Sequence, residues 1–188
     1  MKPETITKQI FKIIPALLLV TLSAFLLQGD VWTFWTWYLL ALVLGAAAMP
    51  LTGRLFRRFQ DRGWMFSKVT AIAVSGFLTW FLVAVKIIKF TTMTCIVVTL
   101  VCAAASLILY CREQKAGFEC IPFAHLDLVY AEELLFFTAF LLWTYFAGFH
   151  PAAYGTEKFM DYGFMEAMMR STTLPARDLW YSEGTINY

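Results

Sequence analysis

Long apolar runs constrain this chain more than any other feature. Runs of about 16–20 apolar residues recur along the sequence, separated by short polar segments. A bilayer core about 30 Å thick is crossed by roughly 20 such residues in a helix. Apolar residues make up 60% of the chain and charged residues 15%, against about 25% charged in an ordinary soluble domain. These proportions exclude a soluble globular enzyme, a disordered tail and a disulfide-stapled secreted module.

The runs predict helices, because lipid forces every backbone polar group to bond within its own segment and because none of them alternates like a barrel strand. We therefore predict an all-α, polytopic membrane protein whose residues 1–149 form a bundle of about five transmembrane helices. The predicted spans cover about residues 11–27, 31–49, 69–88, 92–110 and 128–149. Pro50 is expected to end the second span. The first span could instead be a cleaved signal peptide, but no small-x-small cleavage site follows it, which favours an uncleaved anchor.

Basic residues in the short loops predict the orientation. With the N-terminus inside, ten of the 15 Lys and Arg residues fall on the inner side. The prediction is thus a multi-pass protein of a prokaryotic plasma membrane, with its N-terminus inside and its C-terminus outside. A net charge of only +2 argues against nucleic acid as a partner and leaves membrane lipid as the expected one.

Ionisable groups are scarce in the spans, which disfavours a transporter. Lys68, at the end of the third span, is expected to extend toward the headgroups. Glu132 and Glu133 lie one turn inside the fifth span, where either could cap the inner end of the helix. The two histidines fall on opposite predicted sides and no CxxC pair occurs, so no metal ligands are assigned.

The predicted outer segment, residues 150–188, collects the polar chemistry. We predict an amphipathic helix over about residues 157–171, with Thr156 as its N-cap and Pro175 preventing continuation. Such a helix would lie along the outer membrane surface.

Asp161 stands out on this helix because it falls in the middle of the apolar face, with Glu157 one turn before it. One interpretation is structural: Asp161 caps the helix or pairs with Lys158 or Arg170. The other is functional: a carboxylate at the lipid–water boundary can act as a general base or hold a metal. Spacing alone leaves both open.

Several short motifs resemble a known family. They are residues 155–161 (GTEKFMD), 168–171 (MMRS), 174–180 (LPARDLW) and 184–188 (GTINY), with 50–63 (PLTGRLFRRFQDRG) and 133–136 (ELLF) upstream. Together they resemble the YYY family of prokaryotic multi-pass membrane proteins, a domain of unknown function that is similar to the GT-C membrane glycosyltransferases. The resemblance covers about residues 32–188. Phe159 stands where the family usually has proline, and residues 176–179 replace its proline-rich PPDP.

The resemblance implies a function and an incomplete chain. Family members are much longer, so this chain would be an N-terminal portion, inactive alone, whose missing C-terminal part is a further partner. By analogy with GT-C enzymes, the donor would be a polyprenyl-phosphate-linked sugar on the outer face. Asp161 and Glu157 would be the catalytic carboxylates, and Lys158 and Arg170 would offset the phosphate charge. The cofactor is left open, with a divalent metal beside the lipid phosphate as one alternative. The competing hypothesis is a non-catalytic membrane scaffold or assembly subunit whose outer segment docks a partner.

Overall fold

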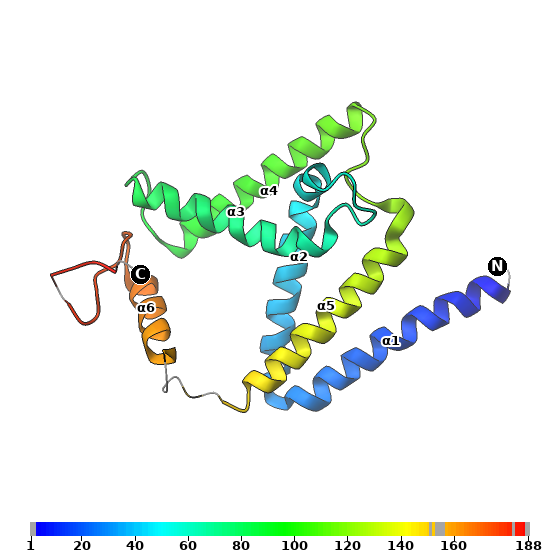
Figure 1. Ribbon diagram of the computed structural model, residues 1–188, viewed down its shortest axis with the longest axis horizontal. Helices are drawn as coiled ribbons and strands as arrows, with labels where there is room; N and C mark the ends of the chain where they lie inside the picture. The colour runs from blue at the N-terminus through cyan, green and yellow to red at the C-terminus, as the bar shows by residue number, and fades with distance from the viewer. Residues whose placement is uncertain (1–2, 151, 153–156, 182, 187–188) are drawn as a thin grey trace.

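The computed structural model of the protein describes residues 3–150, 152, 157–181 and 183–186. Within these ranges every regular element is a helix. Among the described residues, extended backbone pairs only at one isolated antiparallel bridge, between Arg177 and Thr185. The elements are α1 (Pro3–Leu27), η1 (Gln28–Asp30), α2 (Val31–Leu55), α3 (Trp64–Ala84), α4 (Thr92–Lys115), η2 (Phe123–His125), α5 (Leu126–Ala147) and α6 (Lys158–Arg170). The predicted all-α class is confirmed (Figure 1).

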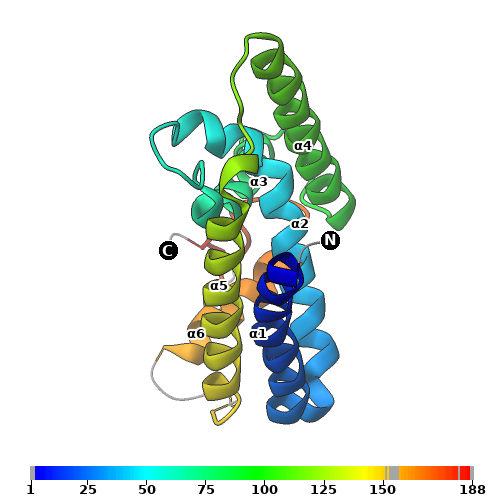
Figure 2. The same ribbon diagram turned by 90° about the vertical axis from the view of Figure 1, so that its right-hand side faces the viewer.

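Three segments of the described chain are long and apolar enough to cross a membrane: Lys12–Leu55, Trp64–Ala84 and Thr92–Lys115. The first is 44 residues long and holds α1 from Lys12 onward together with all of α2, and the chain reverses direction between them at η1 (Figures 1 and 2). Helix α5 is not among the three. The all-α membrane architecture therefore stands, while the count of five spans stays a prediction.

Helix α2 continues through Pro50 to Leu55, so the expectation that proline ends the second span was wrong. Proline removes the N–H that would bond to the Ala46 carbonyl, but membrane helices tolerate a proline where neighbouring groups satisfy the freed carbonyl. Beyond Pro50 the helix continues, and Thr52 Oγ1 donates to the Met49 carbonyl at 3.1 Å. The helix therefore keeps its last turn, which carries Arg54.

An aromatic core joins α2 to α5. Phe34, Tyr38, Phe137 and Leu141 are buried together, with leucines of α1 packed against them. The Tyr38 and Phe137 rings meet edge to face at 4.8 Å, an arrangement that aromatic quadrupoles favour. Helices α1 and α5 run side by side, and the Lys12 ammonium pairs with the Asp127 carboxylate near the start of α5 (Figure 2).

Helices α2, α3 and α4 form the second packing unit. A Cβ at Gly45 of α2 would lie 2.8 Å from Lys68 Cγ and 2.8 Å from Ser67 Oγ, so glycine lets α2 and α3 approach closely. Gly63 takes a left-handed conformation (φ +77°) just before α3, which a side chain would disfavour. Thr91 Oγ1 caps α4 by accepting a bond from the Thr94 amide at 3.2 Å.

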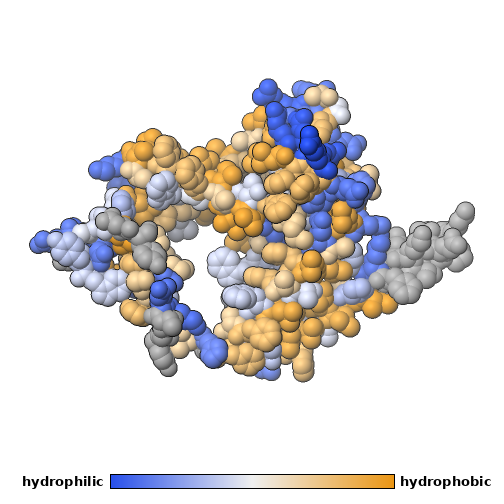
Figure 3. Space-filling view, in the orientation of Figure 1, coloured by the Kyte–Doolittle hydropathy of each residue, from blue (hydrophilic) through white to orange (hydrophobic). Residues whose placement is uncertain are grey.

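Much of the apolar surface faces outward. Side chains such as Leu17, Val43, Phe77 and Leu100 are at least 60% exposed, and orange apolar atoms cover the visible face of the helices in Figure 3. Exposed apolar stripes on this scale are a membrane-facing or partner-facing surface, not that of a soluble monomer.

The connections between helices gather into two groups. The chain from residue 116 to 125 lies against the end of α2, because a Cβ at Gly53 would lie 2.2 Å from the Cys120 carbonyl oxygen. The α3–α4 connection instead meets the segment after α6, since the Phe90 amide donates to the Thr172 carbonyl at 2.8 Å. The five predicted spans also put the α3–α4 connection and the segment after α6 on one side, and their placement relative to a membrane stays a prediction.

Candidate functional site

Helix α6 follows α5 after a short connection, and it begins one residue later and ends one residue earlier than the sequence predicts. Thr156, the predicted N-cap, lies outside the described residues. Glu157 holds the N-cap position through its backbone: its carbonyl accepts the Asp161 amide at 3.0 Å, and its side chain makes no capping bond. None of the α6 residues is buried, so the whole helix is accessible.

The four predicted site residues fall on this helix but do not form one cluster. Asp161 lies in the first turn, exposed, and no hydrogen bond or ion pair joins its carboxylate to another described residue. Lys158 Nζ donates to the His150 carbonyl at 3.4 Å. Arg170 pairs with Glu166 at 2.8 Å and lies nine residues beyond Asp161, about 13 Å along the helix axis. The structure therefore groups Glu157, Lys158 and Asp161 at one end and places Arg170 at the other.

The chain after α6 folds back onto the helix. The edge of the Trp180 indole meets the Phe164 ring at 5.4 Å, and a Cβ at Gly163 would lie 2.8 Å from Leu179 Cδ1. Asp178 Oδ1 accepts the Trp180 and Tyr181 amides and shapes this turn. The turn places Trp180 against Phe164 in the middle of α6 and, at 6.4 Å between ring centroids, against Phe159 in its first turn.

A second polar cluster lies inside the bundle, around the carboxylate of Glu133 on α5. Its Oε1 accepts the Tyr38 hydroxyl at 2.8 Å. Its Oε2 accepts both the Trp64 indole N–H at 2.9 Å and the Lys68 ammonium at 2.6 Å. Three helices, α2, α3 and α5, are thereby tied to one side chain.

Lys68 is enclosed in this cluster. Its side chain is 4% exposed, and its Nζ lies 4.7 Å from the Trp64 ring centroid and 4.5 Å from that of Phe136. The expectation that Lys68 extends toward the headgroups was therefore wrong, because an ion pair and two aromatic faces satisfy the ammonium internally. Glu133 pairs with Lys68 instead of capping its own helix.

Two further carboxylates adjoin the cluster. Asp61 is buried just before α3, where its Oδ2 accepts the Met65 amide at 3.4 Å. Glu132 Oε2 is buried with no hydrogen-bond partner among the described residues. No group of three metal-ligating side chains occurs in the described ranges. The cluster is therefore a helix-joining network and lacks the donor set of a metal centre.

The sequence contains one signal that points to this cluster. Lys68 and Glu133 both fall at the predicted inner end of the bundle, and a carboxylate one turn inside an apolar span needs a partner. Tyr38 and Trp64 carry no such signal, because their hydroxyl and N–H become relevant only once α2 and α3 are placed beside α5.

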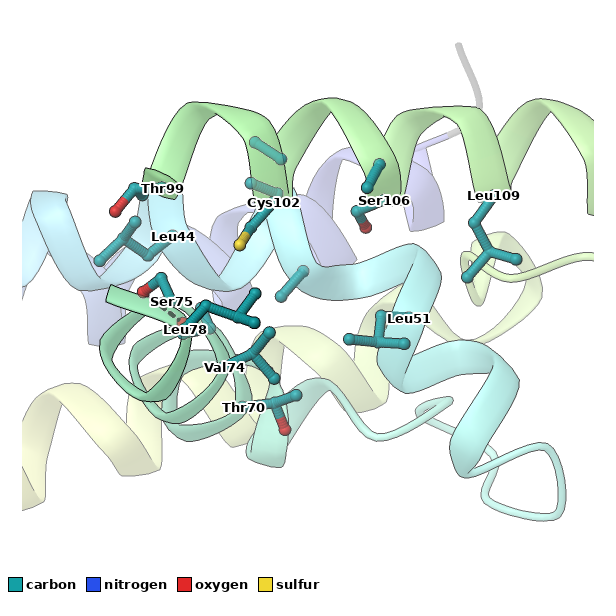
Figure 4. A pocket seen from close by; sticks show the side chains of 15 residues that line it. Leu44, Leu51, Thr70, Val74, Ser75, Leu78, Thr99, Cys102, Ser106 and Leu109 are labelled. Atoms are coloured by element: carbon teal, nitrogen blue, oxygen red, sulfur yellow. Dashed lines mark hydrogen bonds between the residues drawn. The ribbon is translucent and has the colours of Figure 1, made fainter. Parts of the chain in front are cut away.

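A cavity of about 310 Å³ lies between α2, α3 and α4 (Figure 4). Its walls are mostly leucine, valine and alanine, and the Ser75 and Thr99 hydroxyls are bonded to carbonyls of their own helices. Ser106 Oγ is buried there with no partner among the described residues. The cavity lining has hydroxyl groups and the Cys102 thiol but no carboxylate, histidine or lysine beside them, so we assign it to packing.

The chain has a family match. Residues 74–188, more than half of its length, match the model of a family described as uncharacterized membrane protein, DUF2298. The chain belongs to this family. No curated protein matches the chain, and no solved structure does.

The DUF2298 match contains the whole of the α6 site but only part of the Glu133 cluster. It contains α6, the turn after it and Glu133, but it begins after Trp64 and Lys68, which lie in the preceding part of α3. In space, Trp64 and Lys68 lie against Glu133. Glu133, the first residue of the 133–136 motif, thus bonds to two side chains that follow the 50–63 motif in sequence.

Proposed function

We propose that this DUF2298 protein is the N-terminal part of a GT-C-like integral membrane glycosyltransferase that takes its sugar from a polyprenyl phosphate on the outer face of a prokaryotic plasma membrane. The observation that carries the proposal is Asp161: an exposed carboxylate, free of bonds to other described residues, in the first turn of a helix that follows α5. A carboxylate in that position has its proton-accepting capacity available for a substrate.

Asp161 acts as the general base in this proposal. Its carboxylate takes the proton of the acceptor hydroxyl, whose oxygen forms a bond to the anomeric carbon of the donor sugar. The bond between that carbon and the phosphate oxygen breaks, and the phosphate leaves with the electron pair. Glu157, one turn earlier, keeps the same end of α6 acidic.

Lys158 is the positively charged residue best placed to offset the charge of the leaving phosphate, because it lies at the same end of α6 as Asp161. Arg170 lies about 13 Å further along the helix, so its proposed contact is with a more distant part of the donor. Glu157 and Asp161 are also the pair that would hold a Mg²⁺ ion, which needs only one or two carboxylates when it also binds substrate phosphate. That ion would supply charge neutralisation beside the leaving group.

A second candidate is a non-catalytic scaffold or assembly subunit. It is favoured by the exposed apolar side chains of the same segment: Met169 is 75% exposed, Trp180 58% and Tyr181 63%. Exposed aromatic and methionine side chains are typical of protein-binding surfaces.

The test is Asp161→Asn in the full-length protein, assayed as sugar transfer from a polyprenyl-phosphate donor in isolated membranes. Asparagine keeps the size of the side chain and removes the base. We expect the transfer rate to fall roughly 100-fold or more, as is typical when a general base is lost.

Glu183→Gln is the matched control, since Glu183 is an equally exposed acid of the same outer segment with no assigned role. Unchanged transfer in Asp161→Asn would reject Asp161 as the base. Absence of transfer in the wild type, together with capture of a specific membrane partner in mild detergent, would favour the scaffold.

A further inference from the structure

The connections at the end of the bundle away from α6 form a strongly basic surface, which we call the basic end. It consists of Arg54 in the last turn of α2, Arg57, Arg58 and Arg62 in the α2–α3 connection, and Arg112 and Lys115 in the last turn of α4. In Figure 3 hydrophilic atoms gather over the C-terminal end of α4, at the upper right. Residues 54–62 and 112–119 together hold these six bases and three acids, Asp61, Glu113 and Glu119, so bases outnumber acids by two to one.

The fold turns acids inward and bases outward at the basic end. Glu113, with a side chain 9% exposed, accepts bonds from both Arg54 and Arg57, whose side chains are 50% and 49% exposed. Asp61 is buried and bonded to the start of α3. Two of the three acids are therefore hidden from a ligand, while the guanidinium groups that cover Glu113 keep exposed edges.

Aromatic contacts fix two of these guanidinium groups. Arg57 lies over the Phe118 ring at 4.5 Å and Arg62 over the same ring at 4.9 Å. Arg62 also donates to the Arg57 carbonyl. Stacked guanidinium groups lose little further freedom when they bind an anion, which suits bidentate recognition of phosphate.

The remaining three basic residues of the basic end form no ion pair with another described residue. These residues, Arg58, Arg112 and Lys115, are exposed. They add positive charge around the fixed pair without needing rearrangement to meet a ligand.

Apolar side chains adjoin the basic end. Leu55 is 64% exposed and Phe59 48%, on either side of Arg57 and Arg58. The Phe56 and Phe66 rings stack at 4.9 Å beneath them. A surface that alternates exposed apolar and basic groups fits the headgroup region, where one part meets acyl chains and the other meets phosphate.

We propose that the basic end binds the phosphate headgroups of anionic phospholipids from the surrounding bilayer. Charge complementarity selects an anion, and the exposed Leu55 and Phe59 side chains place that anion at the surface of a bilayer. The proposal rests on a different end of the molecule from α6 and is independent of the glycosyltransferase proposal.

The test uses the purified protein in a neutral detergent, titrated with phosphatidylglycerol or phosphatidylcholine and followed by native mass spectrometry. We compare the wild type with R58Q/R112Q/K115Q, which removes only unengaged bases. The matched control is K86Q/K89Q/R177Q, which removes three exposed bases from the other predicted side.

We expect the wild type to retain phosphatidylglycerol in preference to phosphatidylcholine, and the basic-end variant to bind it about tenfold or more weakly, in line with the worth of a basic residue near an anionic membrane. The control should bind like the wild type. Added salt should weaken binding, whereas inorganic phosphate at equal concentration should not displace the lipid.

Any of four results would overturn the proposal. Equal retention of both lipids would show that the headgroup charge is not recognised. An equal loss in both triple variants would show a general effect of charge. Displacement by inorganic phosphate, or preferential capture of RNA by the basic end, would show that the ligand is not the bilayer.

Discussion

Single residues decide how closely the connections of this bundle approach its helices. Gly53 lies in the last turn of α2 against the backbone of residue 120, where any Cβ would overlap a carbonyl oxygen at 2.2 Å. The same contact buries Cys120 completely. Burial raises the pKa of the Cys120 thiol, and the nearby Glu113 carboxylate raises it further.

We predict that Cys120 reacts slowly with a maleimide. In a protein that keeps Cys120 and has alanine at the other three cysteines, the native-state rate at pH 7 should be roughly tenfold or more below that of a matched protein that keeps only Cys111. Because its pKa is raised, the Cys120 rate should keep increasing with pH above 9, where an ordinary thiol is already mostly ionised. Mass spectrometry of quenched samples measures both rates, and denatured protein serves as the control. Equal native rates would contradict the burial.

Residue types alone do not reveal which charges are buried. Asp161 interrupts an apolar helix face in the sequence, yet it lies exposed in the first turn of α6. Lys68 has the sequence position of a helix-end base, although it is the most enclosed cation described, because its burial depends on α5 being placed beside α3. Long-range pairing of this kind is not encoded in local spacing.

At the scale of elements, the apolar runs locate the helices but not all of their ends. Helix α5 lies within two residues of its predicted range, whereas α1 begins eight residues earlier, α3 lies four to five residues earlier and α4 ends five residues later than predicted, because a helix continues into the polar residues that flank its apolar run. Helix α2 extends six residues beyond its predicted end, since a single proline is tolerated inside a membrane helix and does not stop it. The contact of α5 with α2 and α3 could not be predicted from any one element.

We predict that Lys68→Met destabilises the bundle by about 3–5 kcal/mol, the range typical when one partner of a buried ion pair is removed. Glu133 would keep the Tyr38 and Trp64 donors but lose its cation. The measurement is thermal or denaturant unfolding in detergent, followed by tryptophan fluorescence. Lys68→Met/Glu133→Leu should recover part of the loss, because no charge is then left unpaired.

Lys158→Met is the control for that experiment, since Lys158 is exposed and makes only a 3.4 Å contact with a carbonyl. It should change stability by less than about 0.5 kcal/mol. If the double variant loses as much unfolding free energy as the two single variants lose together, Lys68 and Glu133 are not directly coupled.

At the scale of the whole molecule, the two groups of connections are the feature that follows most directly from the sequence. Basic residues predict that residues 51–64 and 111–127 share one side, and the structure brings these segments together through Gly53 and through the Arg54–Glu113 pair. The α3–α4 connection and the segment after α6 meet through Phe90 and Thr172. We expect the first group to face the cytoplasm because it carries the excess of basic residues.

We predict that a membrane-impermeant maleimide labels Lys89→Cys and Glu183→Cys in intact cells, in an otherwise cysteine-free protein. Arg58→Cys and Lys115→Cys should be labelled only after the cells are permeabilised. Each pair tests one group of connections at two sites. Labelling of the second pair in intact cells would reverse the predicted orientation, and a mixed result within a pair would contradict the grouping.

The Lys68–Glu133 pair also bears on how the protein is made. The two residues are 65 positions apart, and a ribosome adding about 5–20 residues per second needs about 3–13 s to cover that distance. Lys68 is therefore synthesised seconds before its anion. It lies in the second turn of α3, close enough to the end of the helix for its ammonium to reach the headgroup layer until then. Because Glu133 supplies the carboxylate that accepts the Lys68 ammonium, α3 can complete this ion pair only after α5 has been synthesised.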